Sequence, residues 1–401
     1  MKHLALAAGL TLGALTQPAL SDPNPADWAT VEAEAHGQTV YWNAWGGSPT
    51  TNAFIDWVGD QVSGRFGVTL EHVKLTDTAD AVTRVLSERQ AGKDDDGAID
   101  LIWINGANFA SMKENGLLFG PFAEDLPNWL YVDVEGKTVR TDFTVPVEGY
   151  EAPWAMAQVV FMYDTADIPT PLPSAAEILE WSKANPGRFT YPQPPDFLGT
   201  TFLKQMLVEL VDDPEPLSRP VSDTNYDTVT APLWDFLEDL TPTLWRQGRA
   251  YPANGPRQIQ LMNDGEIDLA ISFSPSEAST AIANYELPAT VRTFVLDKGT
   301  IGNASFVAIP YNSGSKAGAM VVANFLMSPM AQARAQDPDV LGYSTVLHVE
   351  SLPPEDRTQF DALDLGIATL TPQQLRDVQD EPHPNWMTRI EDDWQARYGV
   401  Q

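Results

Sequence analysis

The sequence VYWNAWGG at residues 40–47 runs from strong β formers into a Gly-Gly turn. It predicts a first strand over Thr39–Ala44, with two Trp and one Asn near its end. A helix over Asn52–Phe66 is expected directly afterwards, because apolar residues recur there at helical spacing. This stretch therefore predicts the first strand and helix of an α/β fold.

The same alternation continues to about residue 104. Strands that alternate with helices predict a mainly parallel sheet with right-handed crossovers. Ligands of such sheets bind beyond the carboxyl ends of the strands, which here read WNAWGG, KLTDT and WINGANF. The further elements expected in this half are a strand over Val68–Leu75, a helix over Ala79–Gln90 and a strand over Ile99–Ile104.

A long extended run, PWAMAQVVFMYDT at Pro153–Thr165, precedes a second α/β unit. Because a return strand is expected over Asn303–Ile309, long strands would join the two halves and leave a cleft between them, a favoured place for a ligand. The elements expected after the run are strands over Gly187–Tyr191 and Ile267–Phe273, helices over Thr201–Val211, Val229–Arg246 and Ala317–Met327, a core segment over Gln258–Asn263 and a mostly helical C-terminal third.

The first 21 residues, MKHLALAAGLTLGALTQPALS, have the layout of a secretion signal: a basic start, a short apolar stretch and small residues at the cleavage point. The apolar stretch is too short to span a bilayer, and no later segment approaches the required length. We therefore expect cleavage of residues 1–21, a loose lead-in over Asp22–Ala35 and no direct membrane insertion of the mature protein.

The chain has 401 residues, enough for two domains, and a formal net charge of −31 from 55 acidic and 24 basic residues. This acidity argues against nucleic acid or an anionic membrane as a partner, because both require a basic surface. It is consistent either with solubility in a salty habitat or with attraction of a cationic ligand. The absence of cysteine excludes disulfides and a lipid-modified cysteine, which favours a protein free in the periplasm.

Aromatic and amide side chains at strand ends are the first candidates for ligand contacts. Trp42 and Trp45 offer flat faces that stack on rings and attract cations, although either ring could instead pack under the loop. Asn43 could orient a polar group of the ligand or cap the turn, and Gly46 allows close approach of the backbone. Trp154, near the start of the extended run, is a further stacking candidate.

Polar residues in loops form the second group of candidates. Asp77, between a strand and a helix, would act either as a helix N-cap or as the partner of a ligand amine. Asn105 and Asn108 follow the apolar strand LIWI, where they would either edge the cleft or shape a turn. Asn303, at the start of the return strand, could hydrogen-bond the ligand.

A helix N-terminus is the third candidate. Gly199, Thr200 and Thr201 would present backbone N–H groups to a phosphate or carboxylate, unless the hydroxyl groups only cap the helix. The remaining candidates, hydroxyl groups and a counter-charge after another strand, are Ser274, Ser276 and Glu277.

Motifs typical of enzymes are absent from the sequence. The five histidines do not stand at zinc-binding spacings, and there is no GxSxG elbow or P-loop. We therefore expect no catalytic residues, no metal and no cofactor. Because acids are abundant, a secreted carboxylate-dependent glycoside hydrolase is the alternative function.

Four segments resemble extracellular solute-binding proteins of ABC importers, of the two-lobed type II periplasmic class that includes thiamine, ferric-iron, polyamine and maltose binders. They are VYWNAWGG, DLIWINGANFASMKENGLLFGP, DGEIDLAISFSPSEAS and GNASFVAIP, which are most similar to the YnjB-like branch. The resemblance implies two mixed sheets flanked by helices, with a hinge of crossing strands. The implied division is a signal peptide at 1–21, one lobe from 36–155 plus 300–330, a second lobe from 156–299 and a mostly helical region at 331–401 that packs on the lobes.

The resemblance also implies a function. A periplasmic receptor of this class would capture a small solute between its lobes, close over it by hinge motion and deliver it to an ABC permease. The candidate residues favour a small polar organic solute, thiamine-like or another ring or amine with an anionic group. The receptor is expected to be a monomer. Iron is disfavoured, because the sequence lacks the neighbouring tyrosines of the ferric-iron members.

Overall fold

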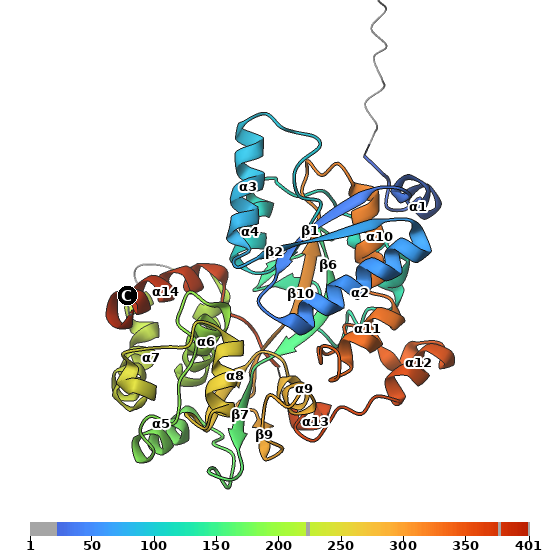
Figure 1. The fold of residues 1–401 in the computed structure, drawn as a ribbon. Helices are drawn as coiled ribbons and strands as arrows, with labels where there is room; N and C mark the ends of the chain where they lie inside the picture. The colour runs from blue at the N-terminus through green and yellow to red at the C-terminus, as the bar shows by residue number, and fades with distance from the viewer. Residues whose placement is uncertain (1–21, 222–224, 376–377, 400–401) are drawn as a thin grey trace, which may run out of the picture.

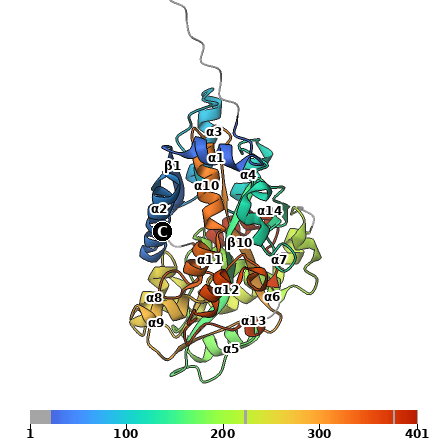
Figure 2. The same ribbon diagram turned by 90° about the vertical axis from the view of Figure 1, so that its right-hand side faces the viewer.

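The computed structural model describes residues 22–221, 225–375 and 378–399, which form two lobes. In Figure 1 the N-terminal strands lie in the upper lobe, and helices α5 to α9 lie with strand β7 in the lower lobe. Figure 2 shows the same order of lobes along an elongated molecule. The signal peptide expected at 1–21 lies outside the described residues. Among the helices of the described part, none has the length and apolar character needed to cross a membrane.

The first lobe is built on a mixed sheet, as predicted. β1 pairs in parallel with β2 and β3, whereas β10 runs antiparallel to β3 and β6. The early α/β repeat thus forms the parallel part, and the return strand adds the antiparallel part. The strands of this lobe are β1 (Thr39–Trp45), β2 (Thr69–Leu75), β3 (Leu101–Ile104), β6 (Glu151–Gln158), β10 (Thr300–Ala308) and β11 (Val378–Gln379), with a hairpin of β4 (Thr141–Asp142) and β5 (Val145–Pro146).

Apolar clusters lie on both faces of this sheet. Leu101 belongs to the cluster that includes α2 and α10, whereas Ile102 and Ile104 belong to the cluster with α3 and α4. Neighbouring residues of β3 therefore face opposite layers, as the pleat of a strand requires. The helices of this lobe are α1 (Trp28–Ala35), α2 (Pro49–Phe66), α3 (Ala79–Gln90), α4 (Ala107–Glu114), α10 (Lys316–Leu326), α11 (Pro329–Gln336) and α12 (Pro354–Asp361).

Helix α1 corrects the expectation of a loose lead-in over Asp22–Ala35. The Asp27 side chain caps the helix by accepting a hydrogen bond from the Thr30 N–H. Val31 and Ala35 are fully buried, and α1 packs on α10. The Pro- and Ala-rich composition concealed both the cap and the helical spacing of these small apolar residues.

The second lobe has a smaller sheet in which β7 lies between β8 and β9 and is antiparallel to both. The strand predicted over Gly187–Tyr191 is wrong, because this segment makes one parallel bridge, from Phe189 to Leu269. The elements of this lobe are β7 (Val160–Asp164), β8 (Leu269–Ser272), β9 (Val291–Phe294), α5 (Ala175–Ala184), α6 (Phe197–Leu210), α7 (Tyr226–Leu240), α8 (Gly255–Asn263), α9 (Glu277–Ala283) and α14 (Pro384–Tyr398).

Helix α7 ends at Leu240 rather than at the predicted Arg246. After Leu240 the chain forms a 3-10 turn (Thr241–Thr243) and becomes extended at Leu244, with ψ 164°, before Arg246 and Gln247 adopt left-handed φ values of +50° and +61°. The amphipathic spacing predicted the longer helix because the spacing of apolar residues does not reveal such a change of backbone conformation.

The extended run divides at Val159 into β6 of the first lobe and β7 of the second. The Val159 N–H donates to the Ile301 carbonyl at 2.8 Å, so this crossing meets the chain where it enters β10. Gln379 of β11 pairs with the same Ile301. The segments that pass between the lobes therefore converge at Ile301, which forms the hinge of crossing strands.

The C-terminal region contributes to both lobes. The helices α11 and α12 and the segment between them place apolar residues from Ala331 to Phe360 in the core of the first lobe. In the second lobe, α14 packs on α6 and buries Trp386, Ile390 and Trp394. Between them the short helix α13 (Pro372–Leu375) precedes β11.

Candidate functional site

Lys204 is a fully buried lysine at the junction between the lobes. It belongs to α6 of the second lobe, and its Nζ lies 2.6 Å from Glu381 Oε2. The same ammonium lies 4.3 Å from the ring centre of Phe143, which the first lobe contributes, and 5.6 Å from that of Phe197. Aromatic faces and a carboxylate are the groups that stabilise a cation away from water. We call this arrangement the lobe junction, comprising Lys204, Glu381, Phe143 and the Asn303 and Asp142 described next.

Asn303, a predicted site residue, lies at the lobe junction. It is buried on β10, and its Nδ2 donates to Glu381 Oε1 at 3.1 Å. The amide thus orients the carboxylate that pairs with Lys204. Burial raises the pKa of Glu381, while the Lys204 ammonium and the Asn303 amide favour its charged form.

Asp142 is a buried carboxylate of the first lobe beside Phe143. Its Oδ2 accepts the Gly106 N–H at 2.6 Å, and its Oδ1 accepts from Asn105 Nδ2 at 3.3 Å. Asn105 also donates to the Ala304 carbonyl at 2.7 Å, so this predicted residue links β3, the β4–β5 hairpin and β10. Burial raises the pKa of Asp142 to about 7, although the Gly106 N–H and the Asn105 amide favour its charged form.

Gly106 determines where the Phe143 ring lies. Its φ is +58°, a conformation that suits glycine, and a Cβ atom there would lie 2.7 Å from the Phe143 ring. Phe143 itself has φ +44° and Thr144 has φ +68°. Two adjacent non-glycine residues are thus held in a rare backbone conformation to present this ring.

The predicted helix N-terminus is corrected by the structure. Helix α6 begins at Phe197, and the side chain of Asp196 accepts the N–H groups of Leu198 and Gly199. Of the amides expected to meet an anion, that of Gly199 is therefore bound by this carboxylate, and that of Thr200 by the Asp196 backbone carbonyl at 2.9 Å. The Thr200 hydroxyl donates to Glu391 Oε1 at 2.6 Å.

The Thr201 hydroxyl completes this local network by donating to the Phe197 carbonyl at 2.7 Å. Together with the Thr200–Glu391 contact, it shows that the hydroxyl groups at this end of α6 bind protein partners. Glu391 lies on α14, so Thr200 fixes α14 against α6.

Two of the predicted stacking residues, Trp42 and Trp154, lie inside the first lobe. Trp42 and Trp154 are 0% and 1% exposed, and their ring planes meet at 85° with centres 6.2 Å apart. The ring centre of Trp103 lies 4.8 Å from that of Trp154, and the ring of Phe54 stacks on Trp154. A stacking role for Trp42 and Trp154 stays a prediction, and it requires these neighbours to move aside.

The other residues predicted near the first strand are closer to the surface. Trp45 is partly exposed, and its ring lies against Gly47. The Gly46 N–H donates to the Leu75 carbonyl, while Asn43 is buried. Within the part of the chain that the structure describes, Trp45, Gly46 and Asn43 make no hydrogen bond or ring contact with the lobe junction, and their role in binding stays a prediction.

Asp77 and Asn108 lie on the opposite face of the sheet, at the ends of α3 and α4. Asp77 is exposed, and its Oδ1 accepts the Ala79 N–H at 2.9 Å from the position before the N-cap residue Thr78. Asn108 is half-buried in the first turn of α4.

A second polar group lies where β8 of the second lobe meets residues 342–344. Glu277 accepts the Ser272 hydroxyl, and the Ser274 hydroxyl donates to the Gly342 carbonyl at 3.3 Å. Ser276 is buried beside Gly342. Burial raises the pKa of Glu277. The three predicted residues are therefore together, at a different end of the interlobe contact from Lys204.

Lys204, Glu381, Asp142 and Phe143 were not predicted as site residues. A signal for Lys204 was present, since FLKQMLV places a charge within an otherwise apolar helical stretch. Asp142 and Phe143 fall in a turn-rich segment, and Glu381 follows a short strand far along the chain. Their meeting depends on the tertiary fold, which local patterns do not encode.

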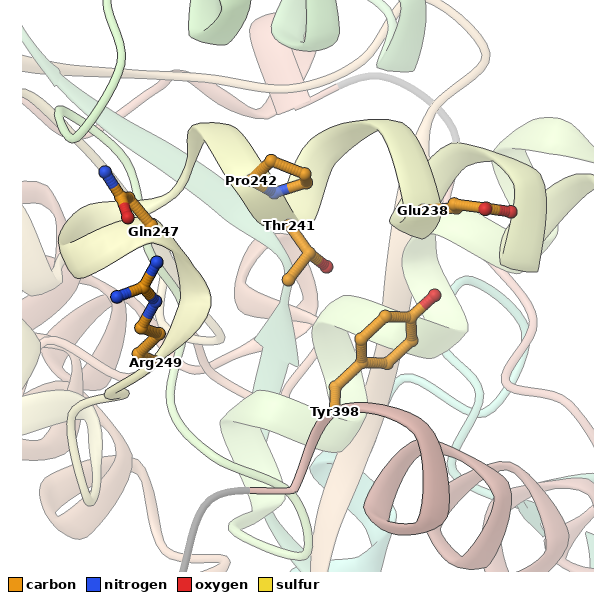
Figure 3. Close-up of a pocket in the computed structure, with 6 residues that line it drawn as sticks. All are labelled: Glu238, Thr241, Pro242, Gln247, Arg249 and Tyr398. Carbon is orange, nitrogen blue, oxygen red and sulfur yellow. The ribbon is translucent and has the colours of Figure 1, made fainter.

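Two cavities formed by described residues lie on or beside the second lobe, and neither is lined by a predicted site residue. The larger, of about 480 Å³, is drawn in Figure 3, where Tyr398 of α14 lies across from Thr241 and Glu238. Gln247 and Arg249 line its other end. The smaller, of about 210 Å³, lies against α6 near the hinge.

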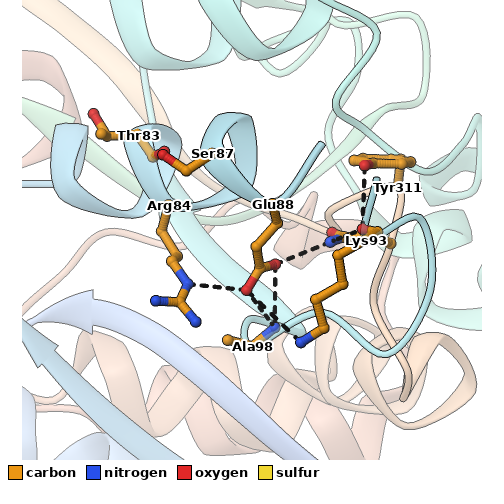
Figure 4. Close-up of polar contacts among 8 residues, drawn as sticks. Thr83, Arg84, Ser87, Glu88, Lys93, Ala98 and Tyr311 are labelled. Carbon is orange, nitrogen blue, oxygen red and sulfur yellow. Dashed lines mark hydrogen bonds and ion pairs between the residues drawn. The ribbon is translucent and has the colours of Figure 1, made fainter. Parts of the chain in front are cut away.

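A polar cluster at the outer end of the first lobe has a structural role. Glu88 of α3 accepts from Arg84 Nε at 2.9 Å, from the Ala98 N–H at 3.3 Å and from Asn312 Nδ2 at 2.9 Å (Figure 4). Burial opposes the charged form of Glu88, but these donors prevail and lower its pKa. The cluster joins α3 to the loop before β3 and to the loop between β10 and α10.

Within the described residues, no group of three or more His, Asp or Glu side chains is placed to hold a metal ion. The geometry instead offers a buried ammonium, carboxylates and aromatic faces between two lobes.

Comparison with known proteins agrees with this architecture. A sequence model of the family described as bacterial extracellular solute-binding protein matches residues 57–359. The chain belongs to this family. It is also 42% identical over 400 residues to protein YnjB of Escherichia coli (strain K12), with 100% of both chains covered. Membership confirms the predicted family and makes the chain a solute-binding protein rather than an enzyme, which rejects the glycoside hydrolase alternative.

Solved structures show the same fold. The periplasmic binding protein AfuA from Actinobacillus pleuropneumoniae, with exogenous fructose-6-phosphate bound, has a TM-score of 0.62 at 12% identity, covering 91% of this chain and 99% of that one. The spermidine/putrescine ABC transporter substrate-binding protein PotD from Streptococcus pneumoniae has a TM-score of 0.59 at 15% identity, covering 90% and 98%. The predicted two-lobed α/β fold, that of ABC transporter substrate-binding proteins, is thereby confirmed.

Proposed function

We propose that the protein is a periplasmic receptor that captures a small polar organic solute between its lobes and delivers it to the permease of an ABC importer. Family membership supports solute binding, and the relatives AfuA and PotD supply the analogy to periplasmic capture and ABC transport. The signal-like start of the chain supports export. The receptor acts as a monomer, with its two lobes as the moving parts.

The observation that carries the location of the site is the buried Lys204–Glu381 pair beside Phe143. Groups from both lobes meet at this one point, so separation of the lobes would expose the ammonium, the carboxylate and two aromatic rings together. A solute held there would contact both lobes at once and favour the closed arrangement. Differential contact of this kind is what allows a ligand to shift a hinge equilibrium.

The chemistry of the lobe junction supports a solute with a ring or amine and an anionic group. Lys204 would bind the anionic group, exchanging its partner Glu381 for the solute. Glu381 and Asp142 would then be available to an amine, and Phe143 and Phe197 to a ring. A thiamine-like molecule with a phosphate satisfies all three requirements.

A thermal-shift screen of the mature protein tests this function. The panel comprises thiamine phosphate, thiamine, spermidine, fructose 6-phosphate and neutral sugars. A ligand at 100 times its dissociation constant adds about 2.7 kcal/mol of stability, a shift of several degrees. Stabilisation by compounds that carry an anionic group, lost in the Lys204→Met variant, supports the proposal. Preference for neutral sugars would contradict the assigned solute class.

A further inference from the structure

The smaller cavity lies beside the hinge, between α6 of the second lobe and Gln379 of β11, and has a polar floor. Its volume of about 210 Å³ is well above the ~10–15 Å³ needed to hold one water molecule, so a small molecule fits. Gln205 and Glu209 of α6 lie buried at its base, whereas Asp212 and Lys298 are exposed at its rim. The cavity is therefore open to solvent but offers buried polar groups to whatever enters it.

Gln205 presents an unpaired donor at this cavity. The residue is fully buried, and its Oε1 accepts the Ile301 N–H at 2.8 Å. Because this bond requires the carbonyl oxygen to face Ile301, the amide nitrogen is turned the other way. Among the described residues Nε2 has no hydrogen-bond partner. An unpaired buried donor is unfavourable, so any acceptor that reaches it would be bound favourably.

Glu209 presents the complementary unpaired acceptor. It is 7% exposed; its carboxylate accepts the Ala175 N–H, but Oε2 has no partner in the described structure. The nearby Lys298 ammonium donates to the Glu209 backbone carbonyl at 2.6 Å rather than to this oxygen. Burial raises the pKa of Glu209, and Lys298 opposes this effect. A second cationic donor is thus the group that this oxygen lacks.

The two unpaired groups are close enough for one small molecule. Residues 205 and 209 stand at positions i and i+4 of a helix, so their side chains emerge from the same face about 5–6 Å apart at Cβ. The carboxylates of Glu209 and Asp212 outnumber the Lys298 ammonium at the cavity, which favours a cation. The net charge of −31 also favours approach of a cation.

We propose that this cavity is a binding site for a short amino alcohol, whose hydroxyl oxygen accepts from Gln205 Nε2 and whose ammonium donates to Glu209 Oε2. The site is separate from the lobe junction and does not depend on the solute proposed above. Since Gln205 also holds Ile301, where the crossing segments converge, the bound molecule fixes the side chain that supports the hinge. Slower hydrogen exchange of the Ile301 amide is the expected consequence.

Titration of the mature protein with ethanolamine, followed by amide NMR, tests the site. We expect saturable shifts at residues 205–212 and 298–301. The isosteric alcohol 1-propanol, which lacks the ammonium, should bind at least tenfold more weakly. Glu209→Gln keeps the size of the side chain and removes its charge, so ethanolamine affinity should fall at least tenfold.

Matched variants distinguish binding at this cavity from a general effect of charge and from binding at the lobe junction. Glu238→Gln removes the same charge from an exposed position of the second lobe and should leave ethanolamine binding unchanged. Val208→Phe fills the cavity from a half-buried position and should abolish binding even if Glu209→Gln fails to fold. Binding should persist in a Lys204→Met/Glu381→Leu variant. No saturable shift up to roughly 50 mM ethanolamine, or equal affinity in Val208→Phe, would overturn the proposal.

Discussion

Lys204 and Glu381 form an ion pair at 2.6 Å in which the two side chains are only 0% and 2% exposed. The pair joins α6 to the segment that leads into α14, and Asn303 of β10 holds the carboxylate from the first lobe's sheet. A buried pair of this kind contributes little net stability, because desolvation of two charges offsets their attraction. We propose that its position between the lobes serves solute binding.

The double variant Lys204→Met/Glu381→Leu tests this explanation through stability. Replacing a buried pair with apolar residues is neutral or stabilising by about 1–4 kcal/mol, whereas removing one partner costs about 3–5 kcal/mol. We expect urea unfolding to show the double variant at least as stable as the wild type and Glu381→Leu alone clearly less stable. A double variant destabilised as strongly as the single one would make the pair a structural element.

Asp142 predicts a defined dependence of stability on pH. Its pKa rises from 3.8 to about 7 on folding, so the folded protein binds the proton more tightly than the unfolded chain between these values. The contribution of Asp142 to the free energy of unfolding is therefore fully present below pH ~4, falls as the pH rises and is lost above pH ~7. This contribution is roughly 4 kcal/mol at most. The other titratable groups that face it are Glu381, Lys204 and the buried Glu151, whose pKa is raised by burial and by the charge of Asp142.

Asp142→Asn cannot ionise and should flatten this part of the profile. Urea unfolding at pH 5 and pH 8 would measure the difference, with Asp60→Asn on the exposed face of α2 as the control. The wild type and the control should lose more stability between the two pH values than Asp142→Asn does. Parallel profiles for all three proteins would show that Asp142 does not titrate in this range.

Gly106→Ala should destabilise the protein and displace Phe143. The new Cβ would lie 2.7 Å from the Phe143 ring at a φ of +58°, so a cost of about 1–3 kcal/mol is expected. Gly64 of α2 is the matched control, since a Cβ there meets nothing within 4 Å. Gly64→Ala should stabilise by about 0.5–1 kcal/mol. Thermal unfolding with equal effects for the two variants would contradict this role of Gly106.

Trp45 and Trp42 should respond differently to truncation. Trp42→Ala removes a fully buried ring and should cost about 3–5 kcal/mol of stability. Trp45→Ala should leave the fold intact and weaken solute binding by about 1–3 kcal/mol, the range for loss of an aromatic contact. Calorimetry with unchanged affinity in Trp45→Ala would assign Trp45 to structure alone.

Much of the first lobe could be predicted from the sequence, because β1, α2, β2 and α3 follow clear periodicity and have strong end signals. Ser48 caps α2 and Gly67 ends it at φ +67°, for example. Periodicity was less informative in the second lobe. The segment ending at Tyr191, predicted as a strand, makes one bridge, and the N-cap residue Asp196 of α6 was not identified from the sequence.

The site was harder to predict than the fold. Asn105 and Asn303 were identified as polar residues at strand ends, which is a local property. Lys204, Asp142 and Glu381 become a site only when three distant segments pack together. The sequence shows that these residues are charged, but it does not show that they are buried. Their burial, which requires them to be paired, arises from the tertiary structure.

The distance between the lobes is the most direct test of solute capture at the junction. The chain has no cysteine, so spin labels at Asp60→Cys on α2 and Asp235→Cys on α7 report this distance without background. With a saturating compound from the screen, double electron–electron resonance should show a shorter and narrower distance distribution. A Lys204→Met/Glu381→Leu background should show no such change. An unchanged distribution in the labelled wild-type background, despite calorimetric binding, would contradict closure around a solute at Lys204.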